Sequence, residues 1–201
     1  MTPLRQLFGP STRTIWRQLS EEIGGKFVSG WSGAKVQATH DEWTVTLDSY
    51  VVPVGKAMMH FTRMRAPYVN PEGFRFTIYR RSIFSAAGVW LGMQDIEVGD
   101  RGFDDAFIIK GTHEERVRAL FASPRLRELV SAQPRMNLTV KDDEGWFGAD
   151  FPDGVDELLF AVPGLIRDID RLKQLYELFA ETLDQLCAIG SAYERDPRVE
   201  L

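Results

Sequence analysis

The sequence lacks the features that would mark a disulfide scaffold, a secreted protein or a membrane-spanning one. Cys187 is the only cysteine among 201 residues, so an intrachain disulfide is excluded. Its neighbours are apolar, which predicts a buried thiol with a raised pKa and argues against a cysteine enzyme. The longest mostly apolar run, residues 83–93, is well below the roughly 20 residues of a membrane-spanning helix, and residues 1–10 lack the apolar core of a secretory signal. These absences predict a cytoplasmic protein with no membrane span.

Catalytic motifs are also missing. The three histidines, His40, His60 and His113, are isolated from one another, whereas zinc sites use closely spaced ligands. Residues 30–34 lack the final glycine of the Gly-x-Ser-x-Gly nucleophile turn, and residues 55–57 lack the glycine and hydroxyl residues of a phosphate-binding loop. We therefore predict no catalytic residues and no cofactor, and we favour a protein that is not an enzyme.

Basic residues are outnumbered, because 24 Lys and Arg face 29 Asp and Glu, for a net charge of −5. Such a surface repels the nucleic-acid backbone and anionic lipid headgroups at long range, so no nucleic-acid partner is expected. Hydrophobic residues make up 44% of the chain and charged residues 26%, as in ordinary globular domains. No run of Pro, Gly and Ser is long enough for a linker. We predict one domain over residues 1–201, with residues 1–10 and 191–201 as poorly ordered tails.

Hydrophobic periodicity predicts an α+β fold. Apolar residues spaced by three and four over residues 11–23, followed by Gly24, predict an N-terminal helix. Alternating apolar and polar residues then predict half-buried strands, most clearly at residues 43–48 and 74–79. Turn signals separate the strands closely enough for a mostly antiparallel, curved sheet; they lie at residues 32–33, 40–41, 53–55, 70–73 and 99–102.

Two short helices between strands and one long helix complete the predicted fold. A capping box at residues 112–115 and a Ser-Pro cap at residues 123–124 indicate the short helices. Alternation returns over residues 136–140 and 155–162 as two or three strands. Over residues 165–186 apolar residues recur at steps of four and three, which predicts a long C-terminal helix packed on the sheet. Its apolar stripe is expected to be core, and a homodimer through part of that stripe is the alternative.

An acidic segment is the first candidate site, and it contains Asp95, Glu97, Asp100, Asp104 and Asp105. Carboxylate oxygens bind hard cations such as Ca²⁺, so Asp95, Asp100 and Asp104 are the candidate metal ligands. Registers beginning at Asp95 or Asp100 lack the sixth-position glycine and the twelfth-position glutamate of an EF-hand loop. In the favoured alternative, Asp100 accepts hydrogen bonds from turn amides, and Asp104 or Asp105 caps a strand or pairs with an arginine.

Arginine residues form the second candidate site. Alternation places Arg63 and Arg65 on one face of a strand, and Arg75, Tyr79 and Arg81 on one face of another. Adjacent strands could bring these guanidinium groups together as an anion-binding patch. We favour a different interpretation, in which the arginines pair with the surplus carboxylates of the surface, including those of the acidic segment.

The run Gly99-Asp100-x-x-Phe103-Asp104-x-x-Phe107, continued by a helix and by Ser123-Pro124, resembles a widespread bacterial family of uncharacterised proteins. The resemblance covers the half of the chain from residue 74 to residue 159. It implies a domain of unknown function and carries over no catalytic residues. Some similar proteins join this domain to membrane-spanning segments, and this sequence has none. From the residues themselves, Phe103 and Phe107 are expected on the same face of a strand that follows a turn at Asp100.

Two hypotheses of function follow. The first is a non-enzymatic cytoplasmic module that binds an apolar small molecule or a protein partner. A deep cavity lined by Phe, Trp and Met would favour the small molecule, whereas an exposed apolar strip on the helix at residues 165–189 would favour the partner. The second is a metal-assisted enzyme that uses the carboxylates of residues 95–105.

Overall fold

The structure is a computed structural model that describes residues 10–30, 33–81, 95–142, 151–199 and 201. Its helices are α1 (Thr12–Glu22), α2 (Arg101–Ala106), α3 (Glu114–Leu120), α4 (Pro124–Ala132) and α5 (Ile169–Ala188). Its strands are β1 (Lys26–Gly30), β2 (Gly33–His40), β3 (Trp43–Val54), β4 (Ala57–Val69), β5 (Phe76–Arg80), β6 (Phe107–Gly111), β7 (Asn137–Lys141) and β8 (Val155–Pro163). The apolar run at residues 83–93 and residues 1–9 of the predicted N-terminal tail lie outside the described residues.

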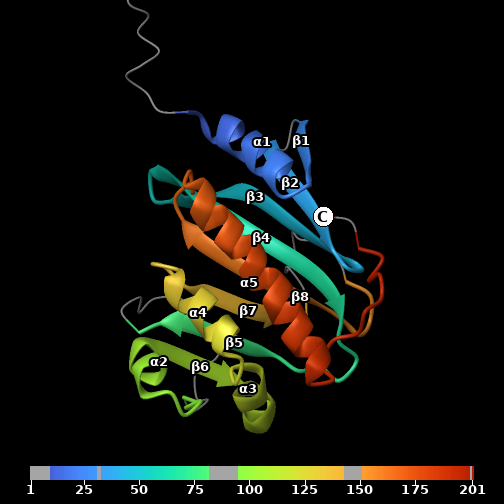
Figure 1. The fold of residues 1–201 in the computed structure, drawn as a ribbon. Helices are drawn as coiled ribbons and strands as arrows, with labels where there is room; N and C mark the ends of the chain where they lie inside the picture. The colour runs from blue at the N-terminus through green and yellow to red at the C-terminus, as the bar shows by residue number, and fades with distance from the viewer. Residues whose placement is uncertain (1–9, 31–32, 82–94, 143–150, 200) are drawn as a thin grey trace, which may run out of the picture.

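The strands form an eight-stranded sheet in the order β1-β2-β3-β4-β8-β7-β5-β6, and every neighbouring pair is antiparallel (Figure 1). β1 to β4 form a meander, because each strand pairs with the next. β8 lies between this meander and the group of β7, β5 and β6, and pairs with both β4 and β7. The antiparallel sheet, the N-terminal helix, the short helices and the long C-terminal helix confirm the predicted fold class.

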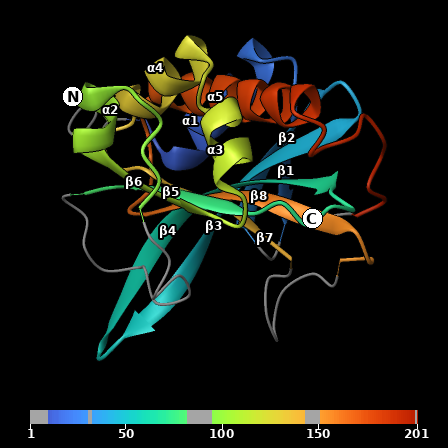
Figure 2. The same cartoon turned by 90° about the horizontal axis from the view of Figure 1, so that it is seen from below.

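The core lies between the sheet and the helices. Helices α1, α4 and α5 pack together on one face of the sheet, as the two views of the ribbon show (Figures 1 and 2). The large side chains between them are at most 1% exposed; they include Trp16 of α1, Trp43 of β3, Phe160 of β8 and Phe179 of α5. The predicted apolar stripe of the long helix is buried in this core, through leucines such as Leu172 and Leu183.

Two helix boundaries follow the signals in the sequence. The Ser11 hydroxyl accepts a hydrogen bond from the Thr14 amide at 3.2 Å and caps α1, and Gly24 after the helix has a φ of +67°. Ser123 caps α4 by accepting from the Leu126 amide at 3.2 Å, and Pro124 opens its first turn, as predicted.

The long helix α5 begins four residues later than predicted, at Ile169 instead of Leu165. Asp168 caps it by accepting from the Arg171 amide at 3.1 Å. The preceding residues make other bonds: the Ile166 amide donates to the Thr62 hydroxyl of β4 at 2.9 Å. This tertiary contact fixes the segment before the helix in an extended path.

The aromatic motif folds differently from the prediction. Residues 101–106 form helix α2, so Phe103 lies on a helix and only Phe107 belongs to a strand. The Asp100 carboxylate accepts from the Phe103 amide at 3.2 Å and caps this helix. The two rings still contact each other, with centroids 4.7 Å apart, across the junction between α2 and β6.

The predicted capping box at residues 112–115 does not form. His113 is the N-cap of α3 and makes no side-chain capping bond. The Thr112 hydroxyl instead accepts from the Arg75 amide at 3.1 Å, which ties the end of β6 to the start of β5. A bond across the sheet therefore replaces the local cap.

The C-terminal segment, predicted to be a poorly ordered tail, has contacts with the sheet among its described residues. Ser191 is fully buried, and Tyr193 forms an isolated bridge with Val69 of β4. The Lys35 ammonium group donates to the Leu201 carbonyl oxygen at 2.6 Å. In the described part of the chain, none of the helices has the length and apolarity to cross a membrane.

Candidate functional site

The acidic segment is held by its own backbone and by arginines. The Asp104 carboxylate accepts from the amides of Val98 at 2.9 Å and Gly99 at 3.1 Å. Asp100 caps α2 and lies 3.3 Å from the Arg127 guanidinium group. Both carboxylates therefore make the contacts expected of residues that shape a turn.

Two other acidic side chains of this segment face separate arginines. Asp95 lies 3.8 Å from Arg81, and Asp105 lies 3.9 Å from Arg101 on the exposed side of α2. Asp95, Asp100 and Asp104 do not converge as a group of metal ligands within the described residues. Metal binding by these three carboxylates stays a prediction.

Arg63 and Arg65 do lie on one face of β4, and both pair with Asp48 of β3. Arg63 makes a bidentate contact with this carboxylate at 2.9 Å, and Arg65 approaches it to 2.6 Å. The Arg63 guanidinium group also stacks over the Tyr50 ring, 5.1 Å from its centroid. Arg63 and Arg65 therefore pair with a carboxylate, but that carboxylate is the largely buried Asp48 and not one of the surface carboxylates of the acidic segment.

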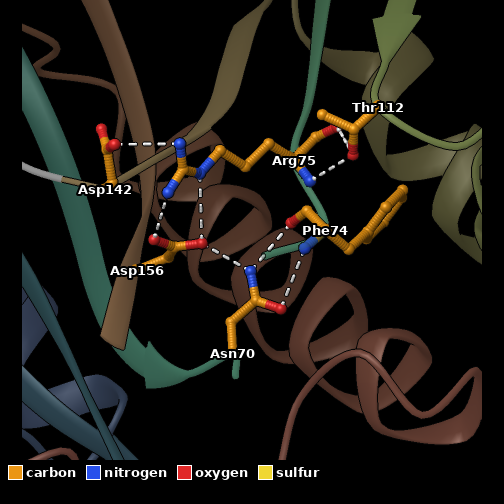
Figure 3. Close-up of polar contacts among 6 residues, drawn as sticks. All are labelled: Asn70, Phe74, Arg75, Thr112, Asp142 and Asp156. Atoms are coloured by element: carbon orange, nitrogen blue, oxygen red, sulfur yellow. Dashed lines mark hydrogen bonds and ion pairs between the residues drawn. The ribbon is translucent and has the colours of Figure 1, made fainter. Parts of the chain in front are cut away.

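A buried polar cluster joins the β4–β5 turn to β8 (Figure 3). The Asn70 side-chain amide donates to the Phe74 carbonyl oxygen at 2.9 Å and to the Asp156 carboxylate at 2.5 Å, and its oxygen accepts from the Phe74 amide at 3.2 Å. The Arg75 guanidinium group lies 3.4 Å from Asp156 and 2.9 Å from Asp142. The cluster fixes the turn onto the sheet.

Burial controls the ionisation of this cluster. It raises the pKa of Asp156 above its ordinary range, while the hydrogen bonds from Arg75 and Asn70 oppose the shift. The neighbouring Tyr68 is fully buried, and its hydroxyl has no hydrogen-bond partner among the described residues. Burial, and then the charge of Asp156, raise the pKa of Tyr68 well above its ordinary range. A buried acid of this kind is a frequent feature of functional sites, but here its hydrogen bonds hold a turn in place.

The face of the sheet opposite the helices contains a groove of about 490 Å³. Polar side chains of the first three strands line most of it, among them Lys26, Lys35 and Thr46, and Val199 and Leu201 also line it. The groove is not the cavity lined by Phe, Trp and Met that an apolar small molecule would need. The large aromatic residues lie in the core instead.

Two further groups lie near the end of α5. His40, Asp41 and Asp184 bring three ligand atoms within 4.8 Å of one another, and the His40 Nε2 atom lies 2.8 Å from the Asp184 carboxylate. The group supplies three side-chain ligands, whereas a structural zinc site uses four, and both carboxylates are exposed.

Burial raises the pKa of the Cys187 thiol to about 11, in the direction expected from its sequence neighbours.

The hairpin of β3 and β4 extends beyond its neighbours and projects away from the helices (Figure 2). β2 pairs with β3 only as far as Leu47, and β8 pairs with β4 only from Thr62. Beyond these points the two strands pair with each other up to a turn at residues 55–56, apart from an isolated bridge between Phe61 and Gly164 at the base. The sequence predicted this turn at residues 53–55, but Pro53 still belongs to β3. We call residues 49–60 the apolar hairpin.

Large apolar side chains are exposed on the apolar hairpin. Val51 is 42% exposed, Val54 51%, Met58 64% and Met59 41%. The register pairs Pro53 with Met58, so Val51 and Met58 lie on one face of the hairpin, and Val54 and Met59 on the other. Among the described residues, Tyr193 is the large apolar side chain that is similarly exposed elsewhere. Exposed apolar side chains gathered in one place indicate a contact surface.

The base of the apolar hairpin is braced. The Tyr50 ring stacks on the Phe61 ring across the two strands, with centroids 5.1 Å apart. Arg63 covers the same Tyr50 ring and is held by Asp48. Two rings, a cation and a carboxylate therefore fix the direction in which the tip projects.

Comparison with known proteins identifies the fold. No protein-family model matches the chain, and no curated protein matches its sequence. The crystal structure of the mycobacterial trehalose monomycolate transport factor A, TtfA, is similar in fold. The similarity has a TM-score of 0.50 at 10% sequence identity, and covers 87% of this chain and 94% of the TtfA chain. At this identity the comparison shows a shared fold.

The exposure of the apolar hairpin was not predicted from the sequence. Its strands contain apolar residues at both odd and even positions, a pattern typical of strands that are buried on both faces. A second signal was present in the sequence: from Ser49 to Pro71 there is no acidic residue, although the chain as a whole is acidic. Together, the two signals distinguish this segment from the other strands.

Proposed function

We propose that this chain is a non-enzymatic binding module that attaches through its apolar hairpin to another component of a lipid-transport system. The observation that carries the proposal is the exposure of Val51, Val54, Met58 and Met59 on one projecting hairpin. An exposed apolar patch costs solubility, so its presence at the tip of a braced hairpin favours a binding role. The lipid-transport setting rests on the fold shared with TtfA, which is named as a trehalose monomycolate transport factor.

The contacts favour a surface partner over an apolar small molecule. The groove of about 490 Å³ among the described residues is lined mostly by lysine, threonine and glutamine side chains. The stripe of α5, which the sequence offered as the interaction strip, is packed in the core through residues such as Leu175 and Leu186. The exposed apolar surface instead belongs to the hairpin. Binding through a homodimer, and a cytoplasmic location, stay predictions.

The hypothesis of a metal-assisted enzyme has less support from the structure. The Asp104 carboxylate already accepts two backbone hydrogen bonds, and Asp100 is used as a helix cap. Asp95 lies beside Arg81 at 3.8 Å. Each group therefore has a local structural role that needs no cation.

Site-specific photo-crosslinking in cells tests the proposal. A photoreactive amino acid replaces Met58, which is 64% exposed on the hairpin, or Arg101, whose side chain is 97% exposed on α2. We expect discrete protein or lipid adducts from position 58 and none from position 101. Equal labelling from both positions, or no adduct from position 58, would contradict a docking role for the hairpin.

A further inference from the structure

We infer that the apolar hairpin docks onto an anionic lipid bilayer, with Val54 and Met58 in the interfacial region and Lys56 among the lipid phosphates. This inference rests on the proposed function and specifies the component that the hairpin contacts. Its basis is the combination of exposed apolar side chains, a local excess of positive charge and a projecting shape at the same point of the fold.

The charge of the hairpin is opposite in sign to that of the chain. The chain has a net charge of −5, yet the apolar hairpin contains no Asp or Glu and includes Lys56. Arg63 and Arg65 lie below the hairpin and are paired with Asp48, so the positive charge at the tip is that of Lys56. Lys56 lies in the turn between the strands, where no acidic side chain of either strand can neutralise it. A negatively charged lipid surface complements this arrangement.

The length of the apolar hairpin separates its tip from the rest of the protein, which carries the net negative charge. A strand rises about 3.3 Å per residue, so Val54 lies about 20 Å along β3 from Asp48. At physiological ionic strength, charges are screened over about 8 Å. The repulsion between the acidic body and anionic headgroups therefore does not reach the tip, and the local charge of Lys56 decides the contact.

The backbone of the hairpin limits the depth of contact and disfavours strand pairing with another protein. Both outer edges of the hairpin lack a neighbouring strand in the part of the chain that the structure describes. Unpaired backbone groups are too costly for the hydrocarbon region, so only the tip would enter, at the headgroup level. Pro53 has no amide hydrogen and lies on the outer edge of β3, where it opposes the addition of a partner strand. Side chains at the tip, rather than the edges, are left to make the contact.

Vesicle flotation tests the inference. The full chain is mixed with vesicles of neutral phosphatidylcholine, or of phosphatidylcholine and phosphatidylglycerol in equal amounts. We expect flotation with the anionic vesicles and much less with the neutral ones. The double substitution Val54→Ser with Met58→Ser should lower the partition coefficient about tenfold or more. Lys56→Gln should lower it about fivefold on anionic vesicles and leave neutral vesicles unaffected.

A matched variant controls for the loss of exposed apolar surface. Tyr193→Ser removes a side chain that is 43% exposed away from the hairpin, and it should float like the wild type. All variants are compared by thermal unfolding, because residues this exposed should leave the melting temperature nearly unchanged. In a separate variant, Met58→Trp, the indole emission should shift to shorter wavelength on anionic vesicles, since the side chain leaves water.

The outcomes separate this inference from the proposed function. Failure of the wild type to float with anionic vesicles, or equal flotation of the Val54→Ser, Met58→Ser double variant, overturns docking onto lipid. If crosslinks from position 58 then join the hairpin to a protein alone, the binding role stands and the lipid surface is wrong. If position 58 gives no adduct and no vesicle binds, both proposals fail.

Discussion

Replacing Asn70 with Asp should make the stability of this protein depend strongly on pH. Asn70 is 2% exposed and supplies the donor that reaches the Asp156 carboxylate at 2.5 Å. The substitution exchanges this donor for a second carboxylate oxygen at nearly the same place. It preserves side-chain size, and it keeps the acceptor for the Phe74 amide. The pH dependence of the change in stability therefore reports the electrostatic part of the Asn70 contact.

The magnitude follows from the contacts. Two full charges about 3 Å apart at an effective dielectric constant of 20 repel by about 5 kcal/mol, so the pair would retain one proton instead. At pH 4 the expected loss is about 1–2 kcal/mol, for the hydrogen bond that Asn70 donates to the Phe74 carbonyl oxygen. Above pH 4 the folded variant binds more protons than the unfolded chain, so its free energy of unfolding falls by up to about 1.4 kcal/mol per pH unit. By pH 7 the total loss should reach about 3–5 kcal/mol.

Burial also raises the pKa of Asp156 in the wild type, so the wild type loses some stability in the same direction as the pH rises above the ordinary carboxyl range. The hydrogen bonds from Arg75 and Asn70 limit that loss. The variant removes one of them and adds a like charge. The difference between the two proteins, rather than either curve alone, therefore reports the coupling.

Urea unfolding of the wild type and the Asn70→Asp variant from pH 4 to pH 8 measures the effect. A loss of 3–5 kcal/mol corresponds to a melting temperature about 10 °C lower at pH 7 for a chain of this size. Asn137→Asp, at a half-buried asparagine that begins β7, is the matched control and should show no added pH dependence. A difference between Asn70→Asp and wild type that stays constant over this pH range would refute the reasoning, because it would mean that the two carboxylates do not interact.

Three further predictions concern the rest of the fold. Burial raises the pKa of Cys187 to about 11, so its reaction with a thiol reagent at pH 8 should be about a hundredfold slower in the folded than in the urea-unfolded chain. In Gly111→Ala, the new Cβ would lie 2.5 Å from a methyl carbon of Val117, which should lower the free energy of unfolding in urea by about 1–3 kcal/mol. Gly102→Ala is the control, because the nearest atom to its new Cβ lies at 3.6 Å, and it should keep or raise the stability of the protein. Asp104→Asn should lower the free energy of unfolding by about 1–2 kcal/mol, because it weakens the two hydrogen bonds from the backbone amides of Val98 and Gly99. Mg²⁺ or Mn²⁺ should not raise the melting temperature of the wild type. A metal-dependent rise in melting temperature that the variant loses would support the enzyme hypothesis instead.

The long and periodic elements could be predicted from the sequence. In α1 and α5 the burial of one face requires apolar residues at steps of three and four, and the sequence shows this directly. The strands at residues 43–48 and 74–79 were found through alternation for the same reason. In the two helices the periodicity of the element decides which side chains are buried, whereas in the strands the polar residues Thr46 and Thr77 are buried as well.

The short elements could not be predicted in the same way. Phe103 and Phe107 are four residues apart, and this spacing puts two side chains on one face in both a helix and a strand. The periodicity therefore left α2 undetermined, and the cap at Asp100 decided it. At residues 112–115 a local capping box competed with a bond from Thr112 to Arg75, and the bond across the sheet formed. A local helix cap decided the first case, and a contact between distant residues decided the second.

The candidate site depends on the same kind of information. The sequence shows that Val51, Val54 and Met58 are apolar, and apolar strand residues are usually buried. Their exposure results from the lengths of the neighbouring strands, because β2 pairs with β3 only as far as Leu47 and β8 pairs with β4 only from Thr62. Those lengths are properties of the assembled sheet. The absence of acidic residues from 49 to 71, together with apolar residues at both odd and even positions, was the local sign that this hairpin differs from the other strands.

The position of β8 has a consequence for the protein as it is made on the ribosome. β8 joins β4 to β7, yet it follows both of them in the chain. Until residues 155–163 have left the exit tunnel, β4 and β7 present unpaired edges, and the meander cannot be connected to the remaining strands. The nascent chain is therefore most exposed to misassociation during a late stage of its synthesis, which is when a chaperone would be most useful to it.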